Sequence, residues 1–100
     1  MAVTGYPRAG IARPFPPAQR EGVTYEGARR WLAEIGGTWD EAKESTPPRC
    51  SIVVSVMSAR GVMVRRHASF DDTLTTRFER RLAVRGTFVR ACEALKAALA

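Results

Sequence analysis

Several features that would place this 100-residue sequence in a familiar class are missing. No stretch approaches the ~18–20 consecutive apolar residues of a membrane-spanning helix. The first twenty residues lack the apolar core of a signal peptide, because they are interrupted by Pro7, Arg8, Arg13 and Pro14. With no export signal, we expect Cys50 and Cys92 to remain thiols and the protein to be cytoplasmic.

Residues suited to catalysis or metal binding are also scarce. His67 is the only histidine, and the two cysteines lie far apart with no C-x-x-C spacing. No P-loop, dinucleotide-binding or H-E-x-x-H motif is present. Asp71 and Asp72 lie near His67, but no nucleophile or oxyanion-binding group accompanies them, and carboxylates there suit the start of a helix. We therefore predict a protein that is not an enzyme and has neither a metal nor a cofactor.

Basic residues outnumber acidic residues by 16 to 10, giving a net charge of +6, and 14 of the 16 are arginine. The charges are segregated. Residues 1–20 and 49–70 contain no acid, whereas residues 21–48 hold six acids against three bases. Arginine suits bidentate contacts to phosphate or carboxylate. An excess of arginine also follows from GC-rich codon usage, so composition alone does not identify a partner.

Residues 1–22 are predicted to form an extended arm. Four prolines exclude a helix or central strand there: Pro7, Pro14, Pro16 and Pro17. The P-x-x-P spacing of residues 14–17 fits polyproline-binding grooves, but Arg20 is one position away from the usual flanking site. We expect instead that Tyr6, Ile11 and Phe15 anchor the arm on its own domain or on a second subunit.

Residues 23–100 are predicted to form a single small α+β domain with elements in the order α-α-β-β-α. The pattern of residues 25–35 predicts an amphipathic helix, with Thr24 as N-cap and Gly36 as the left-handed stop. Thr38 and Glu41 have the spacing of a capping box and predict a short second helix to about Glu44.

The clearest predicted element is a β-hairpin over residues 51–68. With Gly61 in the left-handed position of a three-residue loop, Ser58 pairs with Val62 and Val54 with Arg66. This register collects on one face Ile52, Val54, Val56, Val62, Val64 and Ala68. An isolated two-stranded hairpin is only marginally stable in water, so this hairpin needs a helix packed on it or further strands beside it.

A long C-terminal helix is predicted after Ser69 or Asp71 to pack on the hairpin. Its apolar stripe is wide, and Arg81 and Arg85 fall inside it. We expect the helix to break near residues 84–86, where Gly86 weakens it. The alternative is an unbroken helix whose stripe is an interface.

Arginines of the hairpin and the C-terminal helix are the candidate partner- or phosphate-binding residues: Arg60, Arg65, Arg66, Arg77, Arg81 and Arg85. The three on the helix are spaced i, i+4, i+8 and have no acid three or four residues away. Phosphate could supply their counter-ions, and so could the acidic segment, within the chain or across a dimer. A helix-turn-helix over residues 25–44 is disfavoured, because three acids in residues 39–44 would face DNA phosphates.

The predicted apolar surface exceeds what so small a core can cover, which favours a homodimer or docking into a larger assembly. Candidate self-association or arm contacts are Tyr6, Phe15, Val53, Met57, Met63 and Phe88. The leading prediction is a non-enzymatic binding protein that docks on a protein or nucleoprotein complex, as a phage or mobile-element accessory protein or inhibitor would. The alternative is direct, largely nonspecific nucleic-acid binding through the same arginines.

Overall fold

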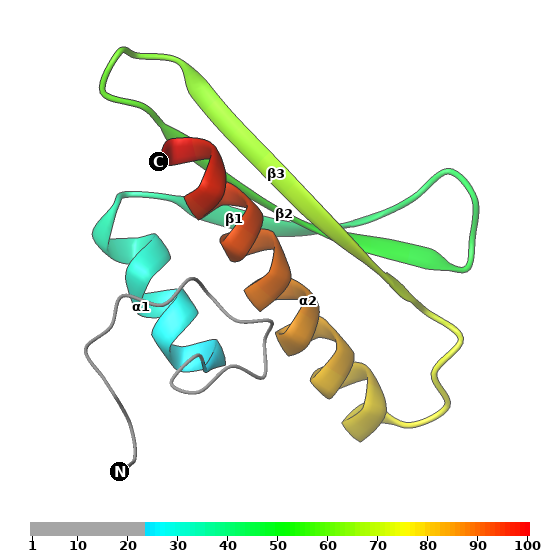
Figure 1. Ribbon diagram of the computed structural model, residues 1–100. Helices are drawn as coiled ribbons and strands as arrows, with labels where there is room; N and C mark the ends of the chain where they lie inside the picture. Colours follow the sequence, from blue (N-terminus) through cyan, green and yellow to red (C-terminus); the bar gives the residue numbers. More distant parts are fainter. Residues whose placement is uncertain (1–23) are drawn as a thin grey trace, which may run out of the picture.

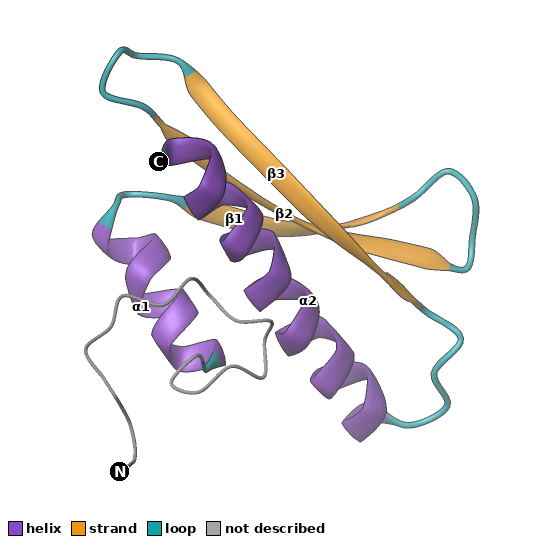
Figure 2. Cartoon of the chain, viewed as in Figure 1, coloured by secondary structure: helices purple, strands orange, loops and turns teal. Residues whose placement is uncertain are grey.

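The computed structural model describes residues 24–100, which form a three-stranded antiparallel sheet with two helices on one face (Figure 1). The elements are α1 (Tyr25–Glu34), β1 (Thr38–Lys43), β2 (Arg49–Met57), β3 (Met63–Asp71) and α2 (Arg77–Leu99) (Figure 2). The α+β class is confirmed, but the order is α-β-β-β-α. The predicted arm, with Tyr6 and Phe15, lies outside the described residues.

The predicted second helix is wrong, since these residues form β1. Trp39 pairs with Val54 and Glu41 with Ile52, so the segment completes the sheet beside β2. A helix of six residues is marginal in water. As a strand, the segment gains a full ladder and turns Trp39 toward the helices, where its ring lies 5.0 Å from that of Phe88. Long-range pairing therefore overrides the local capping-box pattern.

The predicted hairpin register is confirmed. The Ser58 amide donates to the Val62 carbonyl at 2.8 Å, Val54 pairs with Arg66, and Gly61 has φ of +81°. This alternation turns toward the helices four buried side chains of β2: Cys50, Ile52, Val54 and Val56. A slip of one residue would expose all four, so their burial specifies the register.

Helix α1 agrees closely with its prediction. The Thr24 hydroxyl accepts a hydrogen bond from the Gly27 amide at 2.9 Å, and Gly36 follows the helix with φ of +76°. The apolar side of the helix buries Ala28 and Leu32 against the sheet and α2. Both ends are set by local side-chain chemistry, which is why the sequence predicts them.

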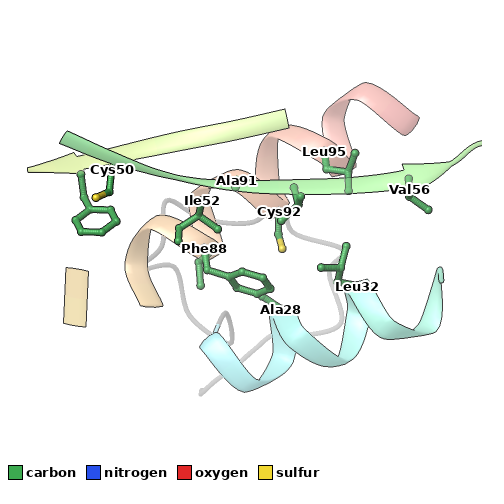
Figure 3. Packing of buried hydrophobic residues seen from close by; sticks show 12 residues of the cluster. Ala28, Leu32, Cys50, Ile52, Val56, Phe88, Ala91, Cys92 and Leu95 are labelled. Carbon is green, nitrogen blue, oxygen red and sulfur yellow. The ribbon is translucent and has the colours of Figure 1, made fainter. Parts of the chain in front are cut away.

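Phe88 lies at the centre of the core, and its side chain has no exposed surface. Its ring makes edge contacts with Tyr25 at 5.4 Å and Trp39 at 5.0 Å, and Figure 3 shows it between the sheet and α1. The sequence assigns Phe88 to self-association or arm contacts, whereas the structure places it in the core. Cys92 is buried nearby, and burial raises the pKa of its thiol to about 12, so the thiol is neutral near pH 7.

Helix α2 runs unbroken through Gly86, so the expected break does not occur. Its 23 residues span about 35 Å, whereas the ten residues of α1 span only about 15 Å. Figure 1 shows α1 beside the C-terminal part of α2 and the N-terminal end of α2 projecting past it. The apolar stripe is buried from Thr87 onward, and the residues before it keep exposed apolar side chains.

A capping box formed by Thr76 and Glu79 stabilises the start of α2, and its removal should lower the free energy of unfolding. The Thr76 hydroxyl accepts from the Glu79 amide at 3.0 Å, while the Glu79 carboxylate accepts from the Thr76 amide at 3.1 Å. We expect Thr76→Ala to lower the free energy of unfolding by about 1 kcal/mol, measured by urea denaturation. Thr76→Ser keeps the acceptor and should be close to wild type. Equal stability of the alanine variant and wild type would contradict this assignment.

Candidate functional site

An arginine-lined groove of about 420 Å³ separates the start of α1 from the first turns of α2. We call it the arginine groove. Its lining residues are Tyr25, Glu41, Arg77, Arg80, Arg81, Val84 and Arg85. The i, i+4, i+8 spacing places three of the predicted arginines on one ridge of the unbroken helix, and this ridge faces the groove.

Two of these arginines have no salt-bridge partner in the part of the chain that the structure describes. Within residues 24–100, no carboxylate forms a salt bridge with Arg77 or Arg81. Arg85 approaches Glu26 at 3.9 Å, and its guanidinium lies 4.8 Å from the centre of the Tyr25 ring. A solvent-exposed ion pair at this distance contributes little to stability. The acids of residues 24–48 therefore form no salt bridge with Arg77 or Arg81 and only a weak one with Arg85.

Arg80, also on the groove, has a different role. Its guanidinium binds Asp72 at 3.0 Å, forms a salt bridge with Glu41 and lies 5.5 Å from the centre of the Phe70 ring. Asp72 in turn accepts a hydrogen bond from the buried Cys50 thiol at 3.3 Å. This network joins all three strands to the first turn of α2 and fixes the direction in which α2 leaves the sheet.

Replacing Arg80 should weaken that attachment. We expect Arg80→Met to cost about 1 kcal/mol of unfolding free energy, since the salt bridges are partly exposed and screened. Chemical denaturation should show this loss for Arg80→Met and almost none for Arg77→Met, which breaks no salt bridge within the described chain. Equal losses in the two variants would contradict the assigned role of Arg80.

The same network has a defined pH dependence. The Cys50 hydrogen bond and the Arg80 guanidinium lower the pKa of Asp72. Its stabilising contribution is therefore present above the unfolded value of about 3.9 and is lost as the pH falls through the folded pKa. The stability difference between wild type and Arg80→Met should shrink over this acidic range.

Exposed apolar side chains lie next to the arginine ridge. Phe78 and Leu82 are 63% and 53% exposed, and Leu74 is exposed just before the helix. We call these three residues the apolar strip. Phe78 lies three residues from Arg81, and Leu82 lies three residues from Arg85, so the strip and the ridge are neighbours on the helix surface. The first turns of α2 therefore offer apolar and cationic groups side by side.

The hairpin arginines do not join this surface. Arg60 lies in the β2–β3 turn, at the end of the sheet away from the start of α2 (Figure 1). The Arg65 guanidinium donates to the Ser55 hydroxyl at 3.2 Å, and that of Arg66 donates to the Arg65 carbonyl at 2.7 Å. The six predicted arginines are thus divided between the hairpin and the first turns of α2.

The face of the sheet away from the helices carries a second hollow, of about 320 Å³. Val53 and Ser55 line it, with Asp40 on the β1 side and Arg65 on the β3 side. Met57 and Met63 form the last pair of the hairpin and are 55% and 48% exposed. Because opposite charges flank the hollow, it has no net preference for an anion or a cation.

Strand β3 is an edge of the sheet, and arginine side chains occupy two of its carbonyl oxygens. Arg66 binds the Arg65 carbonyl, and Arg90 donates to the Ser69 carbonyl at 3.0 Å. Occupied acceptors disfavour the addition of another strand. Pairing of another strand at this edge is therefore disfavoured, and the predicted homodimer stays a prediction.

Two further observations concern the described part of the chain. Residues 24–100 contain no cluster of three or more histidine, cysteine or acidic side chains placed to hold a metal ion. None of the helices in this range is both long and apolar enough to cross a membrane. Comparisons of the chain with protein-family models, curated proteins and solved structures find no match.

Proposed function

We propose that this chain is a non-enzymatic binding protein that docks on an acidic, partly apolar segment of a partner protein through residues 77–85 of α2. One observation carries the proposal. Phe78 and Leu82 are each more than half exposed beside three arginines, of which only Arg85 approaches an acid among the described residues. Aromatic and arginine side chains are enriched in protein interfaces, particularly at their energetic centres.

The two kinds of side chain have different roles in such a contact. Covering Phe78 and Leu82 would stabilise a complex by removing apolar area from water, at about 25 cal/mol per Å². Arg77 and Arg81 would select an acidic partner and accelerate its encounter, because their charges are not neutralised by salt bridges within residues 24–100. Arg80 supports the surface indirectly by holding the first turn of α2 against the sheet.

Nonspecific nucleic-acid binding is the second candidate, favoured by the net charge of +6 and by the same arginines. It has weaker support. A nucleic-acid backbone is best followed by a continuous row of positive charge. Here the β2–β3 turn, which contains Arg60, and the first turn of α2, which contains Arg77, lie toward opposite ends of the sheet (Figure 1). The domain also carries acids on α1 (Glu26) and on β1 (Asp40 and Glu41).

Fluorescence anisotropy on three labelled probes separates the candidates. The first is a peptide of Asp, Glu, Leu and Phe residues, the second carries Lys in place of its acids, and the third is a mixed-sequence duplex. We expect binding of the acidic peptide, its loss in Phe78→Ser, and no effect of Met57→Ser, a matched change at an exposed residue of the hairpin. Failure of the acidic peptide, with duplex affinity falling about 10³-fold between ~50 and ~200 mM salt, would overturn the proposal in favour of nucleic acid.

The predicted homodimer, cytoplasmic location and role in a phage or mobile element stay predictions. Sedimentation of the full chain tests the first. If the apolar strip instead pairs two copies of the chain, Phe78→Ser should convert a dimer to a monomer. In that case the acidic peptide should compete with dimer formation, because both would use the same surface.

A further inference from the structure

The arginine groove concentrates positive charge in one place. Four guanidinium groups line it, and Glu41, the only acid among its described lining residues, already forms a salt bridge with Arg80. Arg77 and Arg81 have no acidic partner in the described domain. Like charges brought together on one helix repel, and an anion between them would relieve the repulsion.

The number of donors exceeds what one carboxylate can use. A carboxylate accepts one guanidinium in the two-oxygen, two-nitrogen arrangement, whereas a phosphate monoester carries about −1.5 to −2 charges and three terminal oxygens. Such a group can accept from two or three arginines together. Arg77, Arg81 and Arg85 supply that number along a single ridge, and the groove of about 420 Å³ has room for the phosphate and the side chain that bears it.

The surroundings of the groove favour a phosphate carried by a protein. Phe78 and Leu82 are exposed beside it and would contact apolar side chains on either side of a phosphorylated residue. A nucleic-acid strand would instead need further cations along its path, and the next arginines of the candidate set, Arg65 and Arg66, lie on β3 and donate to groups of the sheet itself.

We infer that the arginine groove binds a phosphorylated side chain within the acidic, partly apolar segment of a partner protein. This inference rests on the proposed function and names the group recognised there. Arg77 and Arg81 are the principal phosphate ligands, Arg85 is the third, and the apolar strip contacts the flanking residues. Arg80 stays on Asp72 and Glu41 and positions the helix rather than the phosphate.

Three peptides test the inference. They share the same Leu and Phe residues and the same acids, and differ only in a central phosphoserine, serine or glutamate. We expect the phosphopeptide to bind at least about tenfold more tightly than the serine peptide, with glutamate between them. Inorganic phosphate should compete with the phosphopeptide. Arg81→Gln should remove most of the difference between phosphoserine and serine, whereas Arg60→Gln, a matched change in the β2–β3 turn, should leave it intact.

The outcomes distinguish failure of the phosphate site from failure of the proposed docking on a partner protein. Equal affinity for the phosphoserine and serine peptides would overturn the phosphate site and leave protein docking standing. No binding of any of the three peptides would overturn both. Displacement of the phosphopeptide by a single-stranded oligonucleotide at equal phosphate concentration would show that the groove takes phosphodiesters, and would also overturn the inference.

Discussion

Replacing Phe88 by alanine is expected to lower the free energy of unfolding by about 3–5 kcal/mol. The side chain is fully buried and its ring contacts both Tyr25 and Trp39, so its removal opens a cavity where α1, α2 and β1 meet. The whole free energy of unfolding of a small domain is only about 5–15 kcal/mol. Urea denaturation followed by circular dichroism should therefore show a midpoint shifted far toward low denaturant.

Phe78→Ala is the matched control, since it removes the same side chain from the same helix at a position that is 63% exposed. We expect a change within about 0.5 kcal/mol. Phe88→Leu keeps most of the buried volume and should lose less stability. It can be measured if the alanine variant is too unstable to fold. Similar losses at positions 78 and 88 would contradict the described core.

Reversing two charges with Arg77→Glu and Arg81→Glu should weaken binding of an acidic peptide by roughly 100-fold or more, because attraction is replaced by repulsion at the contact. Thermal stability should be unchanged or slightly raised. Neither arginine forms a salt bridge within residues 24–100, and a glutamate at position 77, in the first turn of α2, interacts favourably with the helix dipole.

A second double variant, Arg60→Glu with Arg65→Glu, makes the same change in net charge at the hairpin. It should leave peptide binding nearly intact. If both double variants lower affinity equally, the protein is sensing overall charge rather than a surface on α2. If the α2 variant instead lowers the melting temperature by several degrees, those arginines pair within the folded chain and the assignment of a free ridge is wrong.

The sequence correctly predicts the elements whose ends are set by nearby residues. It predicts the wrong element where pairing with a strand distant in sequence determines the structure. Thr24 and Gly36 bound α1, and Gly61 sets the hairpin turn, so each signal lies within a few residues of its effect. The T-x-x-E pattern occurs twice, at Thr38 and at Thr76, and only the second is a capping box. The first lies in β1, because pairing with β2 provides a complete ladder that a short helix cannot match.

The sequence pattern predicts the start of α2 too early, after Ser69 or Asp71, for a related reason. Ser69 and Asp71 have the composition of a helix start, but β3 continues through them because Phe70 pairs with Cys50 and is buried. The pattern at Thr76 and Glu79 marks the true beginning and was present in the sequence. A strand that extends past a plausible N-cap can be recognised only from its partner strand.

Part of the candidate site follows from sequence and part does not. The ridge of Arg77, Arg81 and Arg85 follows from helical spacing alone. The distinct role of Arg80 does not, because its partner Glu41 lies 39 residues earlier, on a strand for which the local sequence predicts a helix. The exposure of Phe78 and Leu82 likewise depends on the short length of α1, which does not extend over the first turns of α2.

The most direct measurement is a titration of the ¹⁵N-labelled full chain with the phosphoserine peptide, followed by amide chemical shifts. The account predicts progressive shifts in residues 74–85 and around Tyr25, with the turn at residues 58–62 unaffected. Shifts confined to the hairpin or to the open face around Val53 would contradict docking on α2, as would the absence of any shift at saturating peptide.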